Sequence, residues 1–452
     1  MKKKFLALIL AAAMMGTLLT GCGTSKPAET DNKTTETSGA AESEPEETQE
    51  NTDPVKLTIM GGAQLVSVAE VVLKDYLAEH TNVSINFEKY SYAEYPTKMK
   101  VQLSGGDSTP DIMLIHDLFA SQFVRAGYLE DLSGLFSKDE VLPIMGPVTD
   151  NGKVYGLPNQ VTNEYAFVYR SDIFDQLGLQ VPTTFDEYFN TALKLKEAGY
   201  YAGAFDPSDT KSFELFKSFV MMLGGNILDD NGEVTLDKAK EAMELIKKCV
   251  DAGIWHTSTE SDSEAYWTAF NAGKIACTPC IAAHASYYES KVDPNGNGGY
   301  GKLVVTDPIS FSADGRKNFI FNTEYYCINA KSKYKEAAKD IVSYLALSEE
   351  ADLKFSNVNE DGVMAQYSTG SIAGLKAVAN ADLDGWKAYG GQNVVSYLAK
   401  SVLDTNPEIP YVDERSNEIN TIIAGALGEV FLNGRYTIDE AVDIIKKKIK
   451  EI

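Results

Sequence analysis

The sequence predicts an α/β fold built as two lobes, and three observations lead to this prediction. The chain has 452 residues, more than one typical domain holds, and 44% of them are hydrophobic, enough for two sizeable cores. Apolar runs of strand length alternate with amphipathic helical segments, which is typical of largely parallel sheets. Midway along the chain, the stretch 151–199 has the order strand, polar loop, strand and helix, the layout of a crossover between lobes.

The first half of the chain alternates strands with helices. Strands are expected at Leu57–Met60 and Val83–Phe87, and the second is followed by a helix over Tyr92–Leu103. A fully apolar strand is expected at Ile112–Ile115. In open parallel sheets ligands bind beyond the carboxyl ends of strands, so the polar residues after the first and third strands are candidate binding residues: Gln64, His116 and Asp117.

The central stretch ends in a helix with a clear start signal. Thr184 is followed three residues later by Glu187, which is the capping-box pattern, and Gly199 ends the helical periodicity. A second capping box, Thr437 with Glu440, predicts the start of the closing helix.

The second half of the chain returns to the first lobe once and crosses again. A helix is expected at Glu264–Asn271, and the strand at Phe319–Asn329, followed by an amphipathic helix, marks the return. Gly362–Ser371 is the expected third crossing.

The N-terminus has the layout of a bacterial lipoprotein precursor. Lys2–Lys4 precede the apolar run Phe5–Leu19, as in a secretory signal peptide over residues 1–21. The ending Leu-Thr-Gly-Cys is similar to a lipobox, with lipid attached to Cys22. A short uncleaved anchor is the alternative, but a membrane span needs roughly 20 apolar residues. Residues 22–53, rich in Ser, Thr, Glu and Pro, are expected to be a disordered acidic tether.

Charge and motif content narrow the function classes. The formal net charge of −24 argues against nucleic acid or an anionic membrane surface as partner and favours a neutral or cationic ligand. The four histidines show no zinc-ligand spacing, and no nucleophile elbow or phosphate loop is present, so neither a metal nor a cofactor is expected. Acidic residues are abundant, so a glycosidase with a pair of catalytic carboxyl groups stays an alternative function. Cys277 and Cys280 form either a local disulfide or two free thiols.

Four short motifs carry a resemblance to a known family. They are Tyr155–Pro158, Tyr169–Phe174, Gly178–Glu187 and the Phe-x-x-Gly-Lys-x-Ala pattern that begins at Phe270. In their order and spacing they resemble the family 1 extracellular solute-binding proteins of ABC importers, the maltose-binding-protein-like sugar receptors. The resemblance spans Val55–Ile452.

This resemblance implies a two-lobed periplasmic-binding-protein type II fold, or Venus flytrap, in which each lobe is a mostly parallel sheet flanked by helices. Lobe 1 is expected at 54–162 with 323–365, and lobe 2 at 163–322 with 366–452. Hinges are expected near Thr162–Tyr165, Phe321–Thr323 and Gly362–Ser368, and closure about them would trap a ligand.

Sugar binding needs aromatic faces for the pyranose ring and planar polar side chains for its hydroxyls. Residues of both kinds lie at the expected hinges, at the strand ends, near the position where the family places cleft-facing side chains, and in late loops. The candidate binding residues are therefore Gln64, His116, Asp117, Gln160, Asn163, Glu164, His284, Tyr287, Asn322, Glu324, Tyr325, Trp386, Tyr411 and Arg415.

The sequence thus predicts a monomeric, lipid-anchored receptor on the extracellular face of a bacterial cell membrane. It is expected to capture a sugar, in particular an oligosaccharide, and to deliver it to the permease subunits of an ABC importer, without enzymatic activity and without nucleic acid. Two alternatives stay open: a glycan-binding lipoprotein that reports to a sensor, and a surface glycosidase.

Overall fold

The computed structural model describes residues 53–452 except 92–93, 107, 164–165, 210, 258–262, 281, 313–314, 316–318, 358, 361–362, 365–369 and 406–407. It describes the backbone alone at 160–163, 280, 283, 320–321, 359–360 and 363–364. The predicted signal peptide and tether, including Cys22, lie outside the described residues. Within the described part, no helix is long and apolar enough to cross a membrane.

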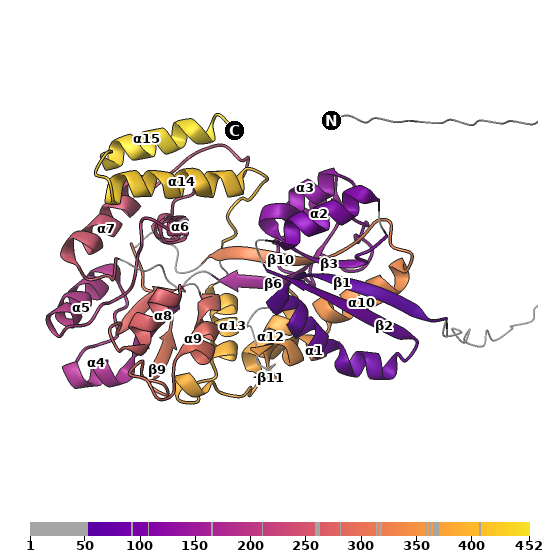
Figure 1. Ribbon diagram of the computed structural model, residues 1–452, viewed down its shortest axis with the longest axis horizontal. Coiled ribbons are helices and arrows are strands. Elements are labelled where there is room, and N and C mark those ends of the chain that lie inside the picture. The colour runs from indigo at the N-terminus through magenta and orange to yellow at the C-terminus, as the bar shows by residue number, and fades with distance from the viewer. Residues whose placement is uncertain are drawn as a thin grey trace, which may run out of the picture. The chain divides into compact units, whose positions relative to one another are not determined.

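The first sheet has five strands in the order β2-β1-β3-β10-β6 (Figure 1). β1 (Val55–Gly62) lies parallel to β2 (Val83–Tyr90) and to β3 (Ile112–His116). β10 (Ile320–Ile328) is antiparallel both to β3 and to β6 (Leu157–Asn163). The strands predicted near residues 57, 83 and 112 and the returning strand are confirmed.

Helices cover both faces of this sheet, because its strands are apolar on both sides. Ile112 and Leu114 point into a core with the buried faces of α1 (Ala63–Glu79), α10 (Lys335–Leu347) and α11 (Glu349–Ser356). Met113 and Ile115 alternate with them and enter a second core. That core is completed by α2 (Tyr95–Gly105) and α3 (Asp117–Arg125). Because successive side chains of each strand point to opposite faces, both faces of the sheet are apolar and each is covered by a layer of helices.

The second sheet has the order β8-β7-β9, and its ladders are antiparallel. Its strands are β7 (Ala166–Arg170), β8 (Cys277–Cys280) and β9 (Leu303–Thr306). Parallel pairing in this half of the chain occurs at single bridges, for example Tyr201 with Ile275 and Ala204 with His256. The two-lobed α/β fold is confirmed, but the expectation of a mostly parallel sheet is wrong for these described ladders. The central strand β7 is paired with segments that return more than 100 residues later in the opposite direction.

Two large cores surround the second sheet. One is built by α4 (Ser171–Leu177), α5 (Phe185–Glu197), α6 (Ser212–Met222), α7 (Ala239–Ala252), α14 (Ser416–Phe431) and α15 (Ile438–Ile449). The other is built by α8 (Glu264–Asn271), α9 (Ala285–Lys291), α12 (Ile372–Asn380) and α13 (Val394–Thr405). Short elements complete the chain: η1 (Gly146–Val148), β4 (Thr149–Asp150), β5 (Lys153–Val154), η2 (Ala282–His284), β11 (Asn359–Glu360), β12 (Val363–Met364) and η3 (Lys387–Tyr389).

One of the three expected hinges coincides with a strand of the first sheet. Hinge residues 321–323 lie inside β10, where the ladder to β6 shifts register between Ile320 and Asn322. Glu164 and Tyr165, and most of 362–368, lie outside the described residues. The lobe boundaries and the hinges therefore stay predictions.

Of the two alternatives for Cys277, a disulfide or a free thiol, the structure has the free thiol. Cys277 is a free and fully buried thiol, as are Cys249 and Cys327. Burial raises the pKa of the Cys277 thiol, so it stays protonated and unreactive at neutral pH.

Both predicted capping boxes are present, at Thr184 with Glu187 and at Thr437 with Glu440. Replacing Thr184 by Ala leaves the Glu187 backbone N–H without its acceptor, and we expect a loss of about 1 kcal/mol in the free energy of unfolding. Thr421→Ala, at an exposed position inside α14, is the matched control and is expected to change it by less than about 0.5 kcal/mol. Urea denaturation measures both, and equal effects would contradict the capping role.

Candidate ligand-binding cleft

A cleft with a volume of about 800 Å³ opens where the three parallel strands of the first sheet end. Its first wall is formed where the strands end: Gly62–Leu65 at the end of β1, Tyr90 and Ser91 at the end of β2, and His116–Phe119 at the end of β3. Gln64 and His116, expected at the rim of a ligand site, line this cleft, and their contact with ligand stays a prediction. The position follows from topology, since parallel strands bring their carboxyl ends to one edge of the sheet.

The facing wall comes from helices of the second half of the chain. The start of α6 contributes Phe213, Glu214 and Lys217, with Lys211 just before it, and His284 and Tyr287 come from the start of α9. The segment that leads into α14 adds a third group: Tyr411, Val412, Ser416, Asn417, Ile419 and Asn420. Strand ends on one side thus face helix starts on the other.

Three ionisable residues cluster at the floor of the cleft, and all are buried. Glu324 of β10 lies directly opposite His116 of β3 in the antiparallel ladder. His116 Nδ1 lies 2.7 Å from Asp117 Oδ1, and Asp117 Oδ2 accepts a hydrogen bond from the backbone N–H of Thr323 at 3.2 Å. One carboxylate therefore connects the start of α3 with β10.

The protonation of His116 follows from its neighbours. Burial alone lowers the pKa of this imidazole, but the carboxylates of Asp117 and Glu324 outweigh burial and raise it above its ordinary value. His116 Nδ1 also lies 3.2 Å from the backbone N–H of Leu118, a contact that requires an unprotonated nitrogen. The ion pair with Asp117 is favoured because it is shorter and involves a charged acceptor.

Glu324 is the least satisfied group of the cluster. Its side chain is among the cleft-lining residues, it is only 8% exposed, and its Oε2 is buried and accepts no hydrogen bond from the described residues. Burial raises the pKa of Glu324 to about 7; the charge of His116 opposes this shift and that of Asp117 adds to it. Near neutral pH, Glu324 is therefore divided between its acid and its carboxylate form.

The opposite wall carries a histidine of different character. His284 stacks on Tyr287, with ring centroids 5.2 Å apart and an angle of 24° between the rings. Burial and the charge of Lys211 lower the pKa of His284 to about 3, so this imidazole is neutral in the physiological range. It offers the cleft a neutral, flat surface.

A second cavity of about 440 Å³ adjoins the cleft and shares with it Asp117, Asn322, Tyr411 and Val412. Tyr325 lines this cavity, although it is almost completely buried and its hydroxyl donates to the carbonyl of Ile144. The two cavities meet at Tyr411, which is 40% exposed.

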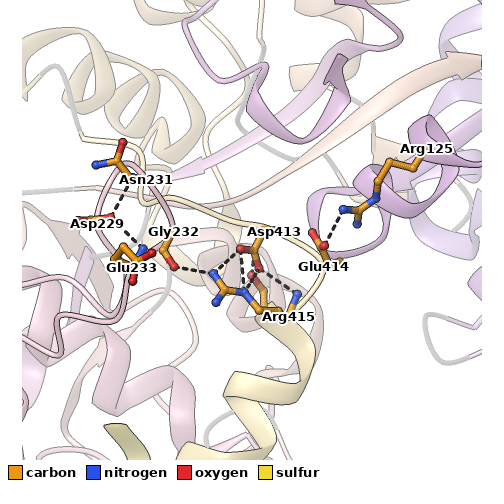
Figure 2. A network of polar contacts seen from close by, with 9 residues as sticks. Arg125, Asp229, Asn231, Gly232, Glu233, Asp413, Glu414 and Arg415 are labelled. Atoms are coloured by element: carbon orange, nitrogen blue, oxygen red, sulfur yellow. Dashed lines mark hydrogen bonds and ion pairs between the residues drawn. The ribbon is translucent and has the colours of Figure 1, made fainter. Parts of the chain in front are cut away.

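Polar contacts hold the segment around Tyr411 from both sides (Figure 2). The Arg415 guanidinium binds the Asp413 carboxylate at 2.7 Å and the carbonyl oxygen of Gly232 at 2.6 Å. Gly232 has φ +78°, and a side chain there would meet Tyr411 and Arg415 at about 3 Å. On the other side, Arg125 of α3 forms a 2.5 Å ion pair with Glu414. These contacts fix the segment, with Tyr411 in it, between α3 and the turn at residues 229–233.

The structure brings together many of the binding residues predicted from the sequence. Tyr325 lines the adjoining cavity, Arg415 braces the segment behind Tyr411, and Gln160 and Asn163 are described by backbone alone in β6. Glu164 lies outside the described residues. The predicted residues that line the cleft are Gln64, His116, Asp117, His284, Tyr287, Asn322, Glu324 and Tyr411.

Trp386, predicted to bind ligand from a loop before Gly390 and Gly391, does not line the cleft. Its side chain is only 7% exposed and packs in a core against Tyr389, whose ring centroid lies 6.0 Å away. An exposed stacking role for Trp386 is therefore wrong. Its backbone pairs with Gln392 in an isolated bridge.

Sequence reasoning missed several cleft residues. Tyr90 and Ser91 follow β2, and the strand-end rule that selected Gln64 and His116 selects them as well. No comparable signal marks the start of α6, because its approach to the cleft depends on the folding of the second half of the chain. In the described part, no group of three or more His, Cys, Asp or Glu side chains could hold a metal ion.

An α/β fold with two sheets, and a cleft where strand ends face helix starts, defines the class of two-lobed binding proteins. The model of the bacterial extracellular solute-binding protein family matches residues 62–352, more than half of the chain. The chain belongs to this family.

Curated relatives align over part of their length. An uncharacterised ABC transporter extracellular-binding protein of Pyrococcus horikoshii is 25% identical over 230 residues, which cover 49% of this chain and 51% of the relative. An arabinooligosaccharide-binding protein of Halalkalibacterium halodurans is 22% identical over 284 residues, which cover 59% of this chain and 61% of the relative. The chain thus spans about half to three fifths of the length of these relatives.

Solved structures match the fold over most of the chain. Maltose-bound MalE3 of T. maritima has a TM-score of 0.69 at 19% identity, covering 88% of this chain and 99% of that chain. An ABC substrate-binding protein of Listeria monocytogenes in complex with cycloalternan has a TM-score of 0.68 at 18% identity, with 88% and 99% covered. At this identity the likeness concerns the fold.

The Asp117 carboxylate is the main group that raises the pKa of His116, and its removal tests this assignment. In Asp117→Asn, we expect the pKa of His116 to fall, because burial then acts with only Glu324 opposing it. An NMR titration of the imidazole C–H signals measures the change. Asp186→Asn, a carboxylate that is 87% exposed on α5, is the control and should leave His116 unchanged. An equal His116 titration in Asp117→Asn and in the wild type would contradict the assignment.

Proposed function

We propose that this protein captures a sugar, in particular an oligosaccharide, in the cleft and delivers it to the permease of an ABC importer. The observation that carries the proposal is the cleft itself: about 800 Å³ of space, with strand ends of the first sheet on one side and helix starts on the other. Family membership supports it. So do the names of similar proteins, which mention an arabinooligosaccharide, maltose and cycloalternan.

The chemistry of the lining suits a carbohydrate. Aromatic rings provide flat surfaces for the C–H face of a pyranose, and buried polar groups between them can take its hydroxyls. The polar groups include Asp117, Asn322 and Glu324. The aromatic residues of the lining are Tyr90, Phe119, Phe213, Tyr287 and Tyr411.

Capture by closure is the mechanism that we propose. A ligand that contacts both walls stabilises the closed form only by its higher affinity for that form, and the permease then recognises the closed protein. The lobes are those predicted from the sequence, 54–162 with 323–365 and 163–322 with 366–452, hinged where the chain crosses between them. A lipoprotein that reports to a sensor would use the same cleft and closure.

A surface glycosidase is the second candidate, on one specific observation. Glu324, with a pKa of about 7, and the carboxylate Asp117 line the same cleft, and paired carboxyl groups in different protonation states are what glycoside hydrolysis uses. Product analysis after incubation with oligosaccharides separates the two functions, because a receptor returns its ligand intact.

Binding is tested by a thermal-shift screen of the purified protein against mono- and oligosaccharides, polyamines and peptides. A ligand at about 100 times its Kd adds roughly 2.7 kcal/mol of stability, which raises the melting temperature measurably. Tyr411→Ala should then weaken binding of the selected sugar roughly tenfold in calorimetry, because it removes an aromatic face. Tyr128→Ala is the control, since Tyr128 packs on Phe123 and does not line the cleft. A shift with cations or peptides only would overturn the sugar assignment.

We also propose that Cys22 carries a lipid that anchors the protein to the extracellular face of the cell membrane, on the strength of the lipobox-like ending of the apolar N-terminal run. Cys22→Ser should move the protein from the membrane fraction to the medium or the soluble extracellular fraction. Cys249→Ser, at a buried thiol, is the control and should not change the location. Membrane association that persists in Cys22→Ser would point to an uncleaved anchor.

A further inference from the structure

The floor of the cleft contains a buried acceptor that no described residue satisfies. Glu324 Oε2 has no hydrogen-bond partner among the described residues, although the side chain is more than nine-tenths buried and lines the cleft. Buried polar oxygens without partners are rare and costly in folded proteins. The simplest partner is a group of the ligand.

We propose that Glu324 binds a hydroxyl hydrogen of the ligand with its ionised carboxylate, so that capture of the ligand releases a proton to solvent. The inference rests on the proposed function and deepens it, because it assigns a chemical preference to one position of the cleft. At this position the ligand must donate a hydrogen bond, and an anionic group is excluded by charge repulsion.

The groups around Glu324 explain why its protonation responds to the ligand. Glu324 faces the imidazole of His116 on β3 and the carboxylate of Asp117 on α3. On its own strand, the charge of Glu324 contributes to the raised pKa of Tyr326. Lys217 of α6 acts on His116 from the facing wall. Other ionisable residues of that wall are Lys211, Glu214 and His284. His284, whose pKa is about 3, stays neutral and cannot compete as the titrating group near pH 7.

The direction of the effect follows from two physical arguments. Glu324 is already buried without a ligand, so the ligand adds little further desolvation to the carboxylate. A hydrogen bond to an ionised carboxylate is about twice as strong as one between neutral groups, so a donated hydroxyl stabilises the ionised form and lowers the pKa of Glu324 in the complex.

The pKa of Glu324 is about 7 in the free protein and lower in the complex, so affinity is highest well above pH 7 and falls as the pH drops through 7 toward the pKa of the complex. A pKa lowered by about one unit in the complex corresponds to a roughly sixfold loss of affinity between pH 7.5 and pH 5.5, toward a limit of about tenfold at lower pH.

Calorimetry with maltotriose, or with the best neutral oligosaccharide of the screen, tests the proposal. Titrations at pH 5.5, 6.5, 7.5 and 8.5 give the affinity profile. At pH 6.5, titrations in buffers of different ionisation enthalpy give the number of protons released. The wild type should lose about sixfold in affinity between pH 7.5 and pH 5.5 and release about half a proton at pH 6.5.

Glu324→Gln keeps the size of the side chain and removes the ionisation. It should bind with a flat pH profile and release no proton, whereas Glu336→Gln, the same change at an 86% exposed position of α10 outside the cleft, should behave as the wild type. Melting curves of the free variants show whether each one folds. His116→Asn serves as a second test if Glu324→Gln does not fold: removal of the positive charge that lowers the pKa of Glu324 should move the affinity loss to higher pH.

These measurements distinguish a wrong role for Glu324 from a wrong receptor function. Sugar binding with the same affinity at every pH overturns the role of Glu324 and leaves the receptor intact. A pH dependence that persists in Glu324→Gln assigns titration to another group, such as His116, and also overturns it. Affinity that increases toward low pH means that Glu324 donates rather than accepts. No binding of any neutral oligosaccharide at any pH overturns both proposals.

Discussion

The position of β10 between β3 and β6 is the constraint on which the rest of the structure depends. This strand comes from residues 320–328, yet it pairs on one side with residues 112–116 and on the other with residues 157–163. It completes the first sheet, brings the returning chain to the edge where the parallel strands end, and places Asn322 and Glu324 at the floor of the cleft. Without this insertion, the cleft would lack its floor.

The alternation of side chains along β10 explains how a carboxyl group comes to be buried there. Tyr325 and Cys327 point into the core with α2 and α3, whereas Tyr326 and Ile328 point into the core with α1 and α10. Glu324 belongs by period two to the face of Tyr326 and Ile328. It is thus a polar residue at the end of an apolar face, where the core gives way to the cleft. The pKa of Glu324 is raised because this position buries its carboxyl group.

Patterns local in sequence predicted the parts of the structure that local physics determines. The capping boxes at Thr184 and Thr437 and the strand ends at Gln64 and His116 depend on neighbouring residues and on the parallel arrangement of the first strands. The antiparallel ladders of β7 depend on segments that arrive from residues 277–306, and no period in the sequence reports their direction. Trp386 shows the same limit, because its glycine-rich surroundings indicate a turn but not which side of the turn packs against a core.

The two walls of the cleft differ in their electrostatics, although the chain as a whole is strongly acidic. The strand-end wall carries an ion pair and a carboxyl group that titrates near neutrality, whereas the helix wall presents a neutral histidine stacked on a tyrosine. Folding has already removed the ionisable groups of the floor from water, so a ligand need not desolvate them again. It can gain hydrogen bonds at the floor and ring contacts at the helix wall. A ligand that contacts both the floor and the helix wall is stabilised most when the walls approach each other, which is the differential affinity that closure requires.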